Sequence, residues 1–171
     1  MKTVGFSGGA LVVELGPVND MLLFFDCLKI VLNQYKPERD FSLLSERLFK
    51  YYLRFNEVNI ANELMSEVYE LFSKTRSRTI DWPVLDSEQS GSKLNRNLEW
   101  LSDVFSRYFS AFTECSESAE VMYDEFKSYP DYKYEPLRIV ITSLPDYLNE
   151  QHRELELYDE LTENDLPFWL R

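Results

Sequence analysis

The side chains that could do chemistry are few in this chain of 171 residues. It contains one histidine, His152, and two cysteines, Cys27 and Cys115. A histidine acts as a general base only when a serine, a cysteine or a carboxylate lies beside it in the fold. His152 is in helical register with Leu148 and Leu155, which favours a histidine at the edge of the core. Cys27 falls on an apolar helical pattern, where a thiol behaves as a small hydrophobic group.

Paired carboxylates are the other groups that could act together. Glu117 with Glu120, and Glu156 with Glu160, are spaced to share a helix face and could hold a cation or work as acid and base. Without a histidine or a polar pocket beside them, a solvated helix face is the favoured interpretation. A single histidine also excludes HExxH, paired ExxH and histidine-rich zinc sites. No GxxxxGK[ST], GxGxxG or GxSxG motif occurs, so we expect no enzyme activity, no cofactor and no metal.

The composition is that of one folded domain spanning residues 1–171. Hydrophobic residues make up 44% of the chain and aromatic residues 15%, which is enough to build a core and argues against intrinsic disorder. Two cysteines without a CxxC pattern are expected to be free, buried thiols of a reducing compartment. No signal peptide or membrane-length apolar run is evident, so we predict a cytoplasmic protein that does not bind a membrane.

The charge is strongly one-sided. The formal net charge is −12, which argues against direct nucleic-acid binding, since contacts to phosphates need clustered Lys and Arg. Residues 114–171 hold 15 acidic and 5 basic residues, a net charge of −10, whereas residues 1–113 are nearly balanced. Aromatic side chains are interleaved with these acids, among them Tyr123, Tyr129, Phe168 and Trp169. Tyrosine and tryptophan in particular are favoured in interfaces.

This acidic and aromatic last third predicts a docking face for a basic protein, although solubility alone could also explain the acids. The partner-binding residues we predict are Asp131, Tyr132, Tyr134, Glu135, Glu156, Asp159, Glu160 and Glu163. The apolar residues 166–170 are expected to pack on the chain's own core.

The elements that must position these residues are mostly helical. Two apolar segments around Gly8 and Gly9 predict a β-hairpin over residues 3–15. Apolar residues three and four apart predict helices over 20–35, 41–55, 61–72, 94–112, 116–126 and 145–161, with Asn19 or Asp20 capping the first and Ser116 the fifth. Residues 79–92 read as a loop, and residues 137–142 as a strand that joins the hairpin. We predict an α+β fold, predominantly α-helical, with about six helices and a small antiparallel sheet built from the N-terminal hairpin and a C-terminal strand.

The chain opens Met-Lys-Thr-Val-Gly-Phe-Ser-Gly-Gly-Ala-Leu-Val-Val-Glu-Leu and continues as acidic, aromatic-rich helices without catalytic groups. In this character it resembles the immunity proteins of bacterial contact-dependent growth inhibition systems, including those paired with an EndoU-type RNase toxin. The resemblance implies a protein that, as a monomer in the complex, binds the toxin domain and covers its active site. It rests on no signature motif, so it carries no residue roles with it.

Two other functions stay open at this point. An acidic helical adaptor or regulatory subunit that binds another basic protein, including a mimic of DNA, needs the same acidic face. An enzyme with a small polar pocket around His152 would need partner groups that the sequence alone does not place.

Overall fold

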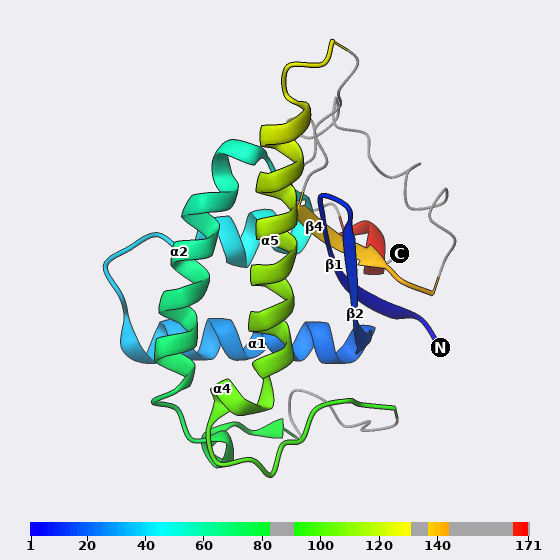
Figure 1. Ribbon diagram of the computed structural model, residues 1–171. Helices are drawn as coiled ribbons and strands as arrows, with labels where there is room; N and C mark the ends of the chain where they lie inside the picture. Colours follow the sequence, from blue (N-terminus) through cyan, green and yellow to red (C-terminus); the bar gives the residue numbers. More distant parts are fainter. Residues whose placement is uncertain (83–90, 131–136, 144–165, 171) are drawn as a thin grey trace.

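The computed structural model describes residues 1–82, 91–130, 137–143 and 166–170. Within these ranges the chain is a mixed helix-and-sheet fold, as predicted. Its long helices are α1 (Val18–Tyr35), α2 (Phe55–Phe72) and α5 (Ser106–Phe126). Figure 1 shows α2 and α5 side by side and running in opposite directions, with α1 crossing both and the sheet beside α5.

The sheet has four strands in the order β2-β1-β4-β3, and every neighbouring pair is antiparallel. The hairpin of β1 (Thr3–Gly8) and β2 (Leu11–Pro17) confirms the predicted N-terminal hairpin. Strand β4 (Leu137–Ile141) pairs with β1, which confirms that the later strand joins it. The fourth strand, β3 (Tyr52–Leu53), was not predicted.

The hairpin turn lies against α5, and glycine makes this approach possible. Gly9 has a φ of 58°, and a Cβ at this position would lie 2.4 Å from the carbonyl oxygen of Ser118. The same serine accepts a hydrogen bond from the backbone N–H of Ala10 at 3.1 Å. A side chain at residue 9 would therefore force the turn away from the helix.

Helix α1 ends as predicted but begins differently. Lys36 adopts the left-handed conformation at its C-terminus, directly before Pro37. Neither Asn19 nor Asp20 caps the N-terminus, because Pro17 is the capping residue and Asp20 lies inside the helix. Asp20 is buried and accepts hydrogen bonds from the Ser92 hydroxyl and the Lys93 backbone N–H, each at 2.7 Å, so it anchors the chain that leads to α5.

The predicted helix over 41–55 is wrong in its second half. A π-helical segment, η1 (Leu43–Leu48), is followed by β3, whose Leu53 pairs with Leu137 of β4 and is fully buried. Pairing at the sheet edge outweighs the helical spacing of the apolar residues here. Helix α2 then starts at Phe55, six residues before the first apolar residue used to predict it.

The helices predicted over 94–112 and 116–126 also differ from the structure. Residues 94–100 are not helical, a short helix α4 covers Leu101–Val104, and α5 runs unbroken to Phe126. Ser116 is buried in the middle of α5 and donates its hydroxyl proton to the Phe112 carbonyl at 2.8 Å, so it is not a cap. The predicted number of about six helices therefore differs slightly from the structure. The helix predicted over 145–161 lies outside the described residues.

The predicted loop over 79–92 begins inside a short 3-10 helix, η2 (Ser77–Thr79). Trp82 follows it and is buried, with its indole N–H donating to the Ser77 carbonyl at 3.1 Å. The C-terminal 3-10 helix η4 (Phe168–Leu170) packs on the chain's own core through Trp169, as predicted, whereas Leu166 just before it is 61% exposed. Among the helices of the described ranges, none is long and apolar enough to cross a membrane.

Candidate functional site

The predicted partner-binding residues all fall outside the described ranges. Residues 131–136 and 144–165 are not described, and these two stretches contain the whole predicted set: Asp131, Tyr132, Tyr134, Glu135, Glu156, Asp159, Glu160 and Glu163. His152 lies in the same stretch. The roles assigned to these residues therefore stay predictions. The candidate site described below is formed by helices within the described ranges.

The aromatic residues of the last third have different environments where the structure describes them. Trp169 is 1% exposed and donates its indole N–H to the Phe49 carbonyl at 3.0 Å, so it belongs to the core and offers no docking surface. Tyr123 stacks on Phe55 of α2, with ring centroids 3.6 Å apart. Tyr129 is 61% exposed. Its ring lies 5.8 Å from that of Phe126 between centroids, and of these three residues it is the most exposed.

The acidic residues of α5 are mostly on the surface. Glu114, Glu117, Asp124 and Glu125 are exposed, and Asp124 forms an ion pair with Lys127 at 3.4 Å. Helix α5 holds five acidic residues and one basic residue, Arg107. Helix α2 beside it holds four glutamates and no basic residue. Three of these glutamates pair with arginines, Glu57 with Arg47 and both Glu63 and Glu67 with Arg39. The acidic surface of α5 therefore extends onto α2 chiefly at the exposed Glu70.

A groove runs between α2 and α5 on the solvent side. We name it the α2–α5 groove. It consists of a hollow of about 610 Å³ and an adjoining one of about 430 Å³, which share Asn62, Ser66 and Thr113. On both helices the lining positions recur every three or four residues, as one face of a helix does. The lining residues are Asn59, Asn62, Glu63, Met65, Ser66, Tyr69 and Glu70 of α2 and Ser106, Phe109, Ser110, Thr113 and Glu114 of α5.

The groove has an apolar floor that is fixed by the core. Met65 and Phe109 are buried. The Phe109 ring makes edge-on contacts with Phe72 at 5.5 Å and with Tyr69 at 5.2 Å between ring centroids. Tyr69 is 43% exposed, so one side of its ring is packed and the other faces the groove. A floor held by ring contacts is rigid, which suits a binding surface.

The charge of the groove is of one sign. Its charged lining residues are Glu63, Glu70 and Glu114. Two other hollows of the described part are lined by charges of both signs. One lies between α1 and η1 and combines Lys29 and Lys50 with Glu46. The other, beside β2, combines Lys93 and Arg107 with Glu14. A basic ligand is therefore favoured electrostatically in the α2–α5 groove over these other two hollows.

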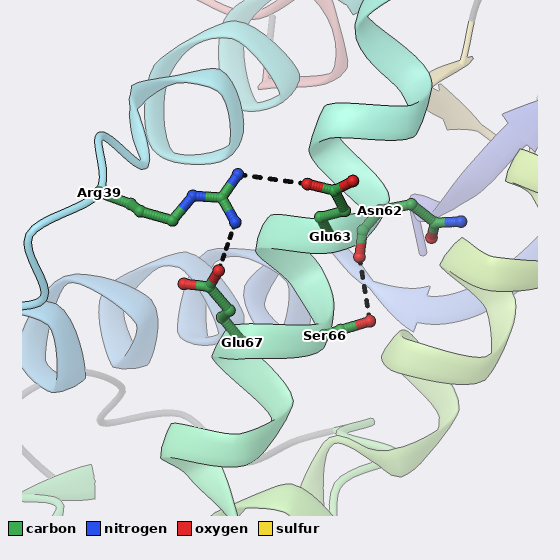
Figure 2. A network of polar contacts seen from close by, with 5 residues as sticks. All are labelled: Arg39, Asn62, Glu63, Ser66 and Glu67. Atoms are coloured by element: carbon green, nitrogen blue, oxygen red, sulfur yellow. Dashed lines mark hydrogen bonds and ion pairs between the residues drawn. The ribbon is translucent and has the colours of Figure 1, made fainter.

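One guanidinium already lies on the acidic side of α2. Arg39, from the segment that follows α1, pairs with Glu63 at 3.4 Å and also with Glu67, which is one helical turn further on (Figure 2). The hydrogen bond that Arg39 donates to Glu67 raises the pKa of its guanidinium most, and the one that it donates to Glu63 raises that pKa further. On the same helix the Ser66 hydroxyl donates to the Asn62 carbonyl at 3.1 Å, so its proton is turned toward the helix backbone.

The two cysteines are free and buried, as predicted. Burial, and then the nearby charge of Asp26, raises the pKa of the Cys27 thiol. Burial and the charge of Glu114 raise the pKa of Cys115 to about 12. Both thiols are therefore protonated near neutral pH, and a protonated thiol is a poor nucleophile.

Sequence reasoning missed the α2–α5 groove. The near balance of charge over residues 1–113 hid the four glutamates of α2, because Lys and Arg elsewhere in that range compensate for them. The signal that could have found it is the run of small polar residues and glutamates at helical spacing along α2. Within the described ranges, no group of three or more His, Cys, Asp or Glu is placed to hold a metal ion.

The comparisons covered protein-family models, curated proteins and solved structures, and in none of the three does this chain find a match.

Proposed function

We propose that this chain is an immunity protein that binds a cognate toxin domain, a basic RNase, and neutralises it by covering its active site with an acidic, aromatic-rich surface. The observation that carries the proposal is the net charge of −10 on residues 114–171. A nuclease active site must attract phosphates, so it presents a basic surface, and an acidic protein surface is its electrostatic complement.

The described helices also carry more acidic than basic residues, which supports the proposal. The exposed acids of α5 and the exposed Glu70 of α2 form an acidic surface over two neighbouring helices. Concentrating like charges on one face costs stability in an isolated helix, by a few tenths of a kcal/mol per pair one turn apart. A surface that carries this cost is explained by a partner of opposite charge. The free, buried cysteines fit a cytoplasmic protein, which is where we propose that neutralisation takes place.

An adaptor that binds some other basic protein remains the second candidate. The acidic surface and the α2–α5 groove favour a basic partner without specifying that it is a toxin. The two candidates differ in whether the chain binds a toxin domain encoded beside its own gene.

Association kinetics with that purified toxin domain test the proposed binding surface. The variant Glu156→Lys, Asp159→Lys, Glu160→Lys and Glu163→Lys should associate about tenfold more slowly at low salt, and its rate should depend less on salt, because electrostatic steering is lost. The matched control reverses four exposed acids of the balanced part, Glu38, Glu46, Asp81 and Asp103. It changes the net charge equally and should associate within about twofold of the wild-type rate.

Two results would count against this surface. An unchanged low-salt rate in the first variant removes residues 156–163 from the interface. If both variants associate equally slowly, the association rate depends on the overall net charge and not on one particular face of the protein.

A further inference from the structure

We propose that the α2–α5 groove is the docking site for one basic amphipathic helix of the protein partner. Its arginine or lysine side chains would pair with Glu70 and Glu114, and its apolar side chains would contact Tyr69 and Phe109. The inference rests on the proposed function in one respect: it takes the partner to be a basic protein. It adds a defined site, built from residues that the sequence did not single out.

Charge complementarity identifies the occupant. Glu70 of α2 and Glu114 of α5 are exposed and line the same hollow from opposite helices. In the described part of the chain, neither carboxylate has an ion-pair partner. Both carboxylates face the same concave surface, so a basic ligand that lies along the groove can pair with each of them.

The chain's own Arg39 shows that glutamates of α2 bind a guanidinium. Its guanidinium lies between Glu63 and Glu67 and contacts both carboxylates (Figure 2). Glu70 is the next glutamate along α2, and it turns toward the groove. A basic side chain of the partner that paired with Glu70 would therefore make the same kind of contact as Arg39 makes with Glu63 and Glu67.

The shape of the groove favours a helix. The lining of α2 runs over twelve residues, from Asn59 to Glu70. The rise from the first to the last is about 16 Å, which is the length of about three helical turns. The walls carry short side chains at Ser66, Ser106 and Ser110, so the backbone of a third helix can approach closely. The exposed side of Tyr69 above the buried Phe109 gives an apolar contact, which is the arrangement of a helix bound in a groove.

A peptide of defined chemistry tests the groove directly. The probe is a synthetic 18-residue helical peptide that presents Arg and Leu on one face, and its affinity for the full chain is measured by calorimetry at low salt. Replacing Glu70 and Glu114 with glutamine should weaken binding about fivefold to tenfold, because two exposed ion pairs are lost. The matched control, Glu38→Gln with Glu46→Gln, removes the same charge outside the groove and should leave the affinity within about twofold.

A second variant tests the shape without changing charge. Ser110→Trp fills the hollow with a large side chain at an exposed position of α5, and it should reduce binding at least tenfold while circular dichroism shows the native helix content. The inference is overturned if the glutamine pair and Ser110→Trp both bind the peptide as the wild type does. It is also overturned if the control pair weakens binding as much as the groove pair.

The same variants, measured against the purified toxin domain, separate this inference from the proposed function. If the toxin domain binds the wild type and all groove variants equally, the groove is excluded as its docking site and the proposed function stands. If the toxin domain does not bind the wild type, the proposed function fails, and the peptide result alone decides whether the groove docks a basic helix.

Discussion

Replacing Phe24 with alanine is expected to lower the free energy of unfolding by about 3–5 kcal/mol, the usual cost of removing a buried phenylalanine ring. Phe24 lies on α1, has 0% exposure, and is at the meeting point of the three long helices. Its ring contacts five other rings, with centroids 5.2–6.0 Å apart, namely Phe25, Phe72, Phe105, Tyr108 and Phe109. Because Phe72 and Phe109 belong to α2 and α5, the same cavity would loosen the support of the α2–α5 groove.

Urea unfolding of both proteins measures this difference. The control is Ile30→Ala on the same helix, where the side chain is already 36% exposed and the expected loss is about 1 kcal/mol or less. If Phe24→Ala were no more destabilising than Ile30→Ala, the ring cluster would not be the centre of the core.

The second large effect is expected at Trp169. Replacing this residue with alanine should lower the free energy of unfolding by about 3–5 kcal/mol. The indole is buried, meets Phe49 edge-on at 5.4 Å between ring centroids, and donates to the Phe49 carbonyl at 3.0 Å. The Trp169 carbonyl in turn accepts a hydrogen bond from the Lys2 ammonium at 3.1 Å. One residue therefore links the C-terminal segment to the region of η1 and to the N-terminus.

Thermal or urea unfolding measures the loss, and Trp169→Phe is the conservative control. This variant keeps an aromatic ring in the core but leaves the Phe49 carbonyl without its indole donor, so it should lose less stability than the alanine variant. The association rate with the toxin domain should stay unchanged in the folded Trp169→Phe protein. Wild-type stability together with lost binding would place Trp169 in the interface and contradict its assignment to the core.

Local sequence signals predicted the parts of the fold whose cause is local. The glycine pair at Gly8 and Gly9 gave the hairpin, because a tight turn against α5 needs a residue without a Cβ. Pro37 marked the end of α1. The apolar run at residues 137–142 gave β4, and its pairing with the hairpin followed because a hairpin alone is marginal in water.

The errors in the fold came from partners distant in sequence. Tyr52 and Leu53 have helical spacing with earlier apolar residues, yet they form a strand because β4 offers a buried sheet edge. Asn19 or Asp20 was predicted to cap α1, but the Asp20 carboxylate accepts hydrogen bonds from Ser92 and Lys93, more than 70 residues away. These contacts cannot be read from a window of neighbouring residues.

Of the candidate site, only the negative charge could be predicted from the sequence. An excess of acidic residues could be read from the sequence, whereas the α2–α5 groove needs two helices from different parts of the chain to lie side by side with particular faces outward. Phe109 illustrates the difficulty, since its apolar ring predicts a core position and it also forms the floor of the groove. The residues predicted from the last third remain to be tested on the chain itself.

The most direct measurement of the central claim is protection of susceptible cells. The toxin domain encoded beside this gene is expressed with and without the chain, and growth and RNA integrity are recorded. Neutralisation predicts that cells carrying both proteins grow and keep intact RNA, while cells carrying the toxin domain alone do not. If the cells die equally in both cases, although both proteins are folded and present, the chain does not neutralise this toxin and the immunity function is wrong.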